Sequence, residues 1–98
     1  MPNLAKDKVD AWYAEWQVLE QTIHALHSAR DKTVKAEMEK AIAHYEAFID
    51  DSLLPTNGRE RLAFIKARPG QYACYRQLDE LYKETKKRIA RVRIQRSK

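Results

Sequence analysis

The stretch VDAWYAEWQVLEQTIHAL, residues 9–26, decides the fold class of this 98-residue chain. Its apolar side chains recur at alternating spacings of three and four residues: Val9, Trp12, Trp16, Leu19, Ile23 and Leu26. This spacing places them on one face of a helix, as the a/d seam that packs against a partner helix. With Asn3 as a candidate N-cap, the pattern predicts a long helix over about residues 4–28.

The seam cannot continue beyond Leu26, because its spacing then leads to polar positions, and the apolar pattern restarts in a new phase. At the change of phase, Ser28 and Asp31 supply polar residues typical of a helix cap. We therefore expect an elongated helical hairpin with arms of about 4–28 and 32–53. One bent continuous helix is the alternative, since neither glycine nor proline stands at the turn.

Residues 54–58, Leu-Pro-Thr-Asn-Gly, are the clearest loop. Proline disfavours helix at the residue before it, and Asn-Gly is a turn pair. Asn57 and Glu60 then fit a capping box. They predict a short helix over about 59–67 that turns Leu62 inward.

Pro69 and Gly70 interrupt the helical pattern once more, before a long basic helix over about residues 71–94. Two glycines and three prolines are too few turn formers for a many-stranded sheet. The sequence therefore predicts an all-α fold. We expect a single all-helical domain over residues 1–98, with a basic C-terminal tail over 83–98.

Charge is distributed unevenly along the chain. Residues 1–54 carry six basic and ten acidic side chains, a net −4, whereas residues 55–98 carry thirteen basic and four acidic ones, a net +9. Such asymmetry indicates a polyanionic partner, an acidic protein surface, or attraction between the two halves of the chain.

The candidate partner-binding residues fall in three places. They are Tyr13, which lies off the seam; Arg68, Pro69, Gly70 and Tyr72 at the second interruption; and Lys83, Lys86, Lys87, Arg88, Arg91, Arg93 and Arg96 in the tail. A basic helix of this kind neutralises phosphates with affinity that falls steeply with salt, and it equally suits an acidic protein surface. The simpler interpretations are a solvated helix face for the tail and a helix stop, with proline at N1, for Pro69.

Signals for chemistry are weak. Glu20, His24, His27 and Asp31 share one helical face, which permits a zinc site, but their spacing is not that of the HExxH motif. Cys74 has no histidine in its half of the chain to act as a base. We expect no catalytic residues, no metal and no cofactor.

The composition also bears on location. The N-terminal residues lack the apolar core of a signal peptide, and no apolar run approaches the ~20 residues of a membrane span. A single cysteine fits a reducing compartment. We expect a cytoplasmic protein with no membrane partner.

The stretch NGRERLAFIKARPGQY, residues 57–72, resembles the anti-RecBCD accessory proteins, the Abc family of short-tailed lambdoid phages. Chain length, helical character and the acidic front with a basic end extend the resemblance over the whole chain. It implies a non-enzymatic phage protein that binds the host RecBCD exonuclease–helicase, chiefly its RecC subunit. Such a protein alters the processing of DNA ends in favour of phage recombination, and the family supplies no catalytic residues to carry over.

A second class fits the same residues. The basic C-terminal helix is loosely similar to that of the primosomal PriC group, which implies a DNA-binding replication or recombination accessory protein. An a/d seam with two tryptophans also pairs between chains as readily as within one, so a homo-oligomer stays open.

Overall fold

Three long helices and one short helix follow one another in the computed structural model, which describes residues 5–96 and the side chains of residues 5–93. The elements are α1 (Lys6–Ser28), α2 (Val34–Phe48), the 3₁₀ turn η1 (Asp51–Leu53), α3 (Gly58–Ala67) and α4 (Tyr72–Arg96). The described residues contain no β-strand, which confirms the all-α prediction. Within the same range, no helix has the length and apolarity needed to cross a bilayer.

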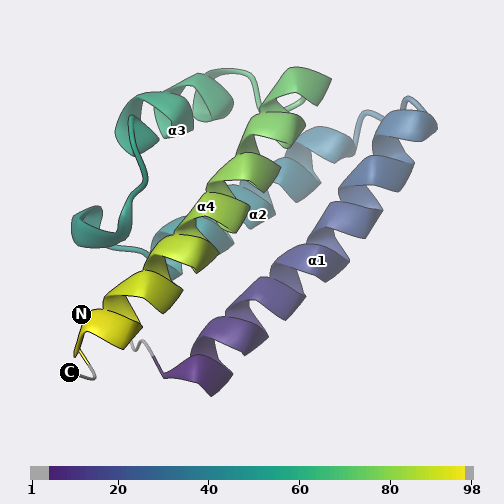
Figure 1. Cartoon of the computed structure of the whole chain (residues 1–98). Helices are drawn as coiled ribbons and strands as arrows, with labels where there is room; N and C mark the ends of the chain where they lie inside the picture. Colours follow the sequence, from purple (N-terminus) through teal and green to yellow (C-terminus); the bar gives the residue numbers. More distant parts are fainter. Residues whose placement is uncertain (1–4, 97–98) are drawn as a thin grey trace.

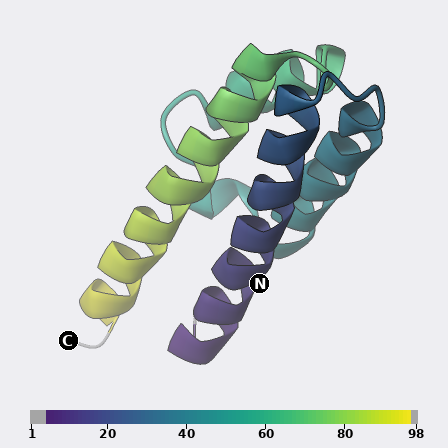
Figure 2. The same ribbon diagram turned by 90° about the vertical axis from the view of Figure 1, so that its right-hand side faces the viewer.

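α1, α2 and α4 form a three-helix bundle, and α3 packs on the outside of α4 (Figure 1). α4 runs antiparallel to α1 and lies beside it along most of its length, as the second view shows (Figure 2). The molecule measures 48 × 26 × 17 Å. Its elongated shape follows from helices of about 35 Å, at ~1.5 Å per residue.

The hairpin between α1 and α2 is confirmed, and a single bent helix is wrong. After Ser28 the chain turns at Arg30, which has a left-handed φ of 55°. The carboxylate of Asp31 accepts hydrogen bonds from the backbone N–H (2.9 Å) and the hydroxyl (2.8 Å) of Thr33. α1 itself ends because the backbone N–H of Asp31 bonds to the carbonyl of Leu26 at 2.9 Å and that of Arg30 to the carbonyl of His27 at 3.1 Å, a Schellman-type cap that needs neither glycine nor proline here.

The second arm of the hairpin is shorter than predicted. α2 ends at Phe48 rather than near residue 53, because Ile49 and Asp50 adopt extended backbone conformations. The Asp50 carboxylate accepts a hydrogen bond from the backbone N–H of Ser52 at 3.0 Å and so begins η1. An aspartate that caps the following turn offers the backbone an alternative to the helix.

The short helix is confirmed to within one residue, but its capping box is wrong. Asn57 has a left-handed φ of 58° and makes no side-chain cap hydrogen bond. Asparagine tolerates this conformation, so it acts as the turn residue instead of the cap. The loop then closes tightly on Gly58, where an added Cβ would lie 3.0 Å from the Cβ of Leu54.

The outer helix ends also differ from the sequence-based expectation. α1 starts after Ala5, which makes no side-chain cap bond, and the predicted N-cap Asn3 lies outside the described residues. The long basic helix is confirmed with bounds shifted by one or two residues. Pro69 precedes it by three residues, so it stops α3 but is not the N1 proline of α4.

The predicted apolar faces meet in one core. Its buried aromatic and large aliphatic members include Trp12, Trp16, Ile23, Met38, Tyr45, Leu62, Ile65, Leu78, Leu81, Tyr82 and Ile89. The Trp16 and Tyr82 rings stack 4.3 Å apart with an interplanar angle of 3°. The tryptophan seam of α1 therefore packs within the chain.

Polar bonds fix α4 in the core. The hydroxyls of Tyr45 and Thr85 lie 2.6 Å apart in a buried hydrogen bond, and Tyr82 donates to the backbone carbonyl of Ala41 at 2.7 Å. Thr85 and Ile89 are fully buried. Residues 83–93, predicted as part of a basic tail, thus belong to the bundle.

Candidate interaction surface

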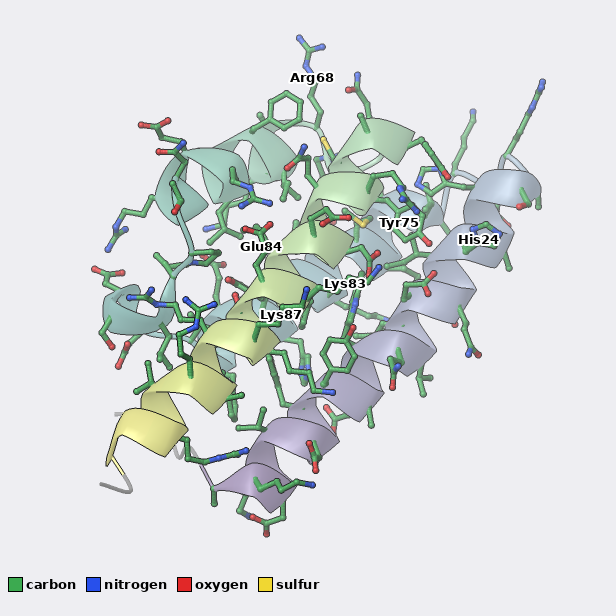
Figure 3. All side chains as sticks on the ribbon, viewed as in Figure 1. His24, Arg68, Tyr75, Lys83, Glu84 and Lys87 are labelled. Carbon is green, nitrogen blue, oxygen red and sulfur yellow. The ribbon has the colours of Figure 1, made fainter. Side chains whose placement is uncertain are left out.

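The basic residues of α4 lie along the part of the helix that runs beside α1 and past η1. Lys83, Lys87, Arg88 and Arg91 are exposed, while Lys86 and Arg93 are half-buried. Lys83 and Lys87 project from the side of α4 that faces the viewer in Figure 3, one turn apart. We call these six residues the basic face. Arg96 was predicted with them, but its side chain lies outside the described residues.

Three members of the basic face make contacts within the molecule. The Lys83 ammonium lies 2.8 Å from a carboxylate oxygen of Asp79 on the same helix. The Lys86 ammonium lies 4.3 Å from the ring centroid of Tyr13 on α1, within cation–π range. The Arg88 guanidinium donates to the backbone carbonyl of Ser52, at 3.2 and 3.3 Å. Tyr13, which was predicted separately from the tail, therefore lies against the basic face.

The field of the basic face reaches α1. The pKa of Asp10 is lowered, first by the hydrogen bond that its carboxylate accepts from Lys6 and further by the positive charges of Lys86 and Arg93. Direct ion pairs between the two halves of the chain also form, between Arg59 and Asp51 and between Lys66 and Glu46, so the halves attract each other.

Two cations of the basic face make no ion pair within the described residues. Among the described residues, neither Lys87 nor Arg91 has an ion-pair partner, and both are exposed. The only acidic side chain between residues 83 and 93 is Glu84, and it is already engaged. Arg61 on α3 donates two hydrogen bonds to its carboxylate, of 2.7 and 3.1 Å, and these bonds lower the pKa of Glu84. The surplus of positive charge is therefore not neutralised within the described molecule.

The second group of predicted residues lies at the corner between α3 and α4. Arg68 is exposed and extends from this corner (Figure 3). Tyr72 is 52% exposed. Gly70 is also exposed, but Pro69 is buried and lines a hollow with Ile42 of α2. Its peptide bond is trans.

The predicted residues do not form one patch. Tyr72 and Arg91 are nineteen positions apart on α4, which corresponds to roughly 28 Å at ~1.5 Å per residue. The structure instead gives two surfaces: the basic face with Tyr13, and the corner with Arg68, Gly70 and Tyr72.

The polar residues once considered for zinc are engaged in other contacts. Glu20 accepts a hydrogen bond from the Tyr75 hydroxyl, and His24 and His27 pack against the Tyr75 ring. Asp31 is occupied at the hairpin turn. Among the described residues, no group of three acidic, histidine or cysteine side chains is arranged to hold a metal ion.

Cys74 is fully buried, and burial raises the pKa of its thiol. Its sulfur donates a weak hydrogen bond to the backbone carbonyl of Phe64 at 3.8 Å. A protonated, enclosed thiol is a packing group and a poor nucleophile.

The sequence did not reveal the polar pairs that position the basic face. Arg61 and Glu84 are 23 residues apart, and the Tyr45–Thr85 pair is separated by 40. No local spacing rule connects them, because each pair forms only when α4 folds back along the hairpin. The one available signal was Thr85 itself, a polar residue at a position that the helical period turns inward.

Comparison with known proteins adds one match. Residues 50–97, just under half of the chain, match a family model described as YpoC-like protein. The matched part contains η1, α3 and α4, and hence the basic face and the corner but not the first hairpin. The chain matches no curated protein and no solved structure.

Proposed function

We propose that this protein is a non-enzymatic phage modulator that binds the RecBCD exonuclease–helicase in the host cytoplasm. In this proposal the basic face docks on an acidic surface of the RecC subunit and alters the processing of DNA ends in favour of phage recombination. The partner is taken from the resemblance of residues 57–72 to the anti-RecBCD proteins.

The observation that carries the proposal is the pair Lys87 and Arg91. Both are exposed cations without an ion-pair partner among the described residues. Opposite charge across an interface accelerates encounter and selects the partner. An acidic protein surface would supply the carboxylates that Lys87 and Arg91 lack within the described residues.

The way α4 is fixed in the bundle also supports docking through the basic face. α4 is held by the buried Tyr45–Thr85 hydrogen bond and by the bond from Trp16 Nε1–H to Asp79, at 3.3 Å. A surface fixed before binding loses little conformational entropy on docking. The basic face is thus presented as a rigid element.

The first test is co-elution with purified RecBCD in size-exclusion chromatography, followed by an assay of its exonuclease on linear duplex DNA. We expect a stoichiometric complex and altered degradation of DNA ends. Elution of the two proteins as separate peaks at low salt, with nuclease activity unchanged, would contradict the proposal.

A DNA-binding accessory protein is the second candidate, favoured by one specific observation. The Tyr13 ring lies beside Lys86, and an aromatic ring among cations is a typical element of single-strand binding surfaces. Fluorescence anisotropy with a labelled oligonucleotide tests it. Binding that weakens steeply between 50 and 200 mM salt, as phosphate contacts require, would favour this candidate. Absence of DNA binding alongside a RecBCD complex would favour the modulator.

A further inference from the structure

We propose that His27 is a pH-sensitive latch that joins the C-terminal end of α1 to the first turn of α4. In its neutral form the imidazole holds Tyr72 and Tyr75. Protonation expels the ring from this site and releases the start of α4 together with the corner that carries Arg68 and Gly70. This inference concerns a conformational change that the proposed binding function does not include.

The latch is built from aromatic contacts. The His27 ring stacks on Tyr75, with centroids 5.6 Å apart and planes at 28°, and it meets Tyr72 edge-on at 5.3 Å. Tyr72 and Tyr75 also contact each other at 5.5 Å. His27 therefore joins a three-ring cluster, two members of which belong to the first turn of α4.

One nitrogen of this ring is enclosed without a partner. His27 Nε2 is the one buried side-chain nitrogen or oxygen, within the described range, that lacks a hydrogen bond. In the neutral tautomer with its proton on Nδ1, Nε2 carries only a lone pair, and the cost of burial is modest. In the imidazolium, Nε2 carries a charged N–H, for which enclosure without an acceptor is far more costly.

The charged groups around the ring do not offset this cost. On α1, His24 lies one turn away and adds positive charge whenever it is protonated, while the carboxylate of Glu20 already accepts the Tyr75 hydroxyl. On α4 the facing groups are the neutral phenols of Tyr72 and Tyr75. The balance on these two helices favours the uncharged ring.

The hairpin turn and α2 contribute the remaining groups. A hollow beside His27 is lined by the cations of Arg30, Lys32 and Lys35 and by one carboxylate, Asp31, which is bonded to Thr33. The surroundings on this side are therefore also positive. Burial first, and the charge of His24 second, lower the pKa of His27 below its usual 6.5.

The sign of the pH dependence follows. The released ring takes up a proton near its ordinary pKa of 6.5, before the latched ring does. The latch is closed above that pH and loses stability as the pH falls below it. Release is confined to the end of the bundle, because Trp16 and Asp79 hold α4 two turns further along.

The experiment compares thermal unfolding at pH 7.5 and pH 5.5 for the wild type, His27→Gln and the matched control His24→Gln. Glutamine stays neutral at both pH values. We expect the wild-type melting temperature to fall at pH 5.5, His27→Gln to remove at least half of that fall, and His24→Gln to retain most of it. An equal fall in His27→Gln and wild type would overturn the proposal.

Hydrogen exchange on the wild type provides a second readout that needs no variant. After correction for intrinsic rates, lowering the pH should accelerate amide exchange at least tenfold over residues 72–76 while leaving the amides around Leu81 unchanged. Uniform acceleration along α4, or no acceleration at its start, would contradict a local latch.

Discussion

Arg61 of α3 and Glu84 of α4 form a two-pronged ion pair, with Nη2–Oε2 at 2.7 Å and Nη1–Oε1 at 3.1 Å. Together with the ion pair between Lys66 and Glu46, it links the outer helix α3 to the bundle. It has a second consequence, because it occupies Glu84, the one acidic side chain between residues 83 and 93. Breaking it therefore affects both the attachment of α3 and the charge offered to a partner.

Replacement of Arg61 by alanine should destabilise the protein by about 1 kcal/mol, the upper end for a half-exposed pair with paired hydrogen bonds. Urea unfolding followed by circular dichroism measures it. The matched control is Arg59→Ala, which removes an ion pair with Asp51 whose side chains are both 71% exposed. That variant should be nearly neutral, and an equal loss in both would contradict the distinction.

The same pair predicts an effect of pH. The hydrogen bonds from Arg61 lower the pKa of Glu84 below the ordinary 4.5. A carboxylate of this kind contributes stability that is present above 4.5 and is lost as the pH falls through its folded pKa. The stability difference between wild type and Glu84→Gln should therefore shrink in acid. A difference that grows as the pH falls would contradict this sign.

Removal of the buried Thr85 hydroxyl should lower the free energy of unfolding more than removal of a hydroxyl at an exposed position. Thr85→Val leaves the Tyr45 hydroxyl without its partner in the core, and an unsatisfied buried hydroxyl costs ~1–3 kcal/mol. Adding Tyr45→Phe removes the orphaned group and should recover part of the loss. A double-mutant cycle by urea unfolding measures this recovery, and strictly additive losses would contradict it.

The two glycines should respond differently to alanine. At Gly58 the new Cβ would lie 3.0 Å from Leu54 Cβ and 3.1 Å from its Cδ2, so the loop must shift, at a cost of about 1 kcal/mol or more. At Gly70 the nearest atom, Lys35 Cβ, is 3.8 Å away, and the backbone is not left-handed. Gly70→Ala should be neutral or slightly stabilising. Thermal unfolding compares them, and equal melting temperatures would contradict the difference.

The sequence predicted the helices well because their apolar periods are nearly uninterrupted. The seam from Val9 to Leu26 located α1, and the phase change after it located the hairpin. The errors lie at helix ends, where side chains compete with the backbone. Asp50 ended α2 early, and Asn57 took a left-handed turn instead of capping α3.

The sequence predicted which residues belong to the candidate surfaces, but not how these residues lie relative to one another in the folded chain. The charge of α4 is visible in the sequence, but the engagement of Lys83, Lys86 and Arg88 depends on contacts made only in the folded chain. The burial of Pro69 depends likewise on packing near α2. A helical period tells which side of α4 is polar, but not which of its cations make contacts within the folded chain.

The most direct measurement is the affinity of the protein for purified RecBCD, determined by biolayer interferometry at 100 and 300 mM salt. The variant Lys87→Glu/Arg91→Glu reverses two cations of the basic face that make no ion pair within the described range, and Lys32→Glu/Lys35→Glu is the control of equal charge change on the hairpin. We expect at least tenfold weaker binding for the first variant, wild-type affinity for the second, and unchanged helicity in both. Equal affinity of wild type and Lys87→Glu/Arg91→Glu at both salt concentrations would contradict docking through the basic face.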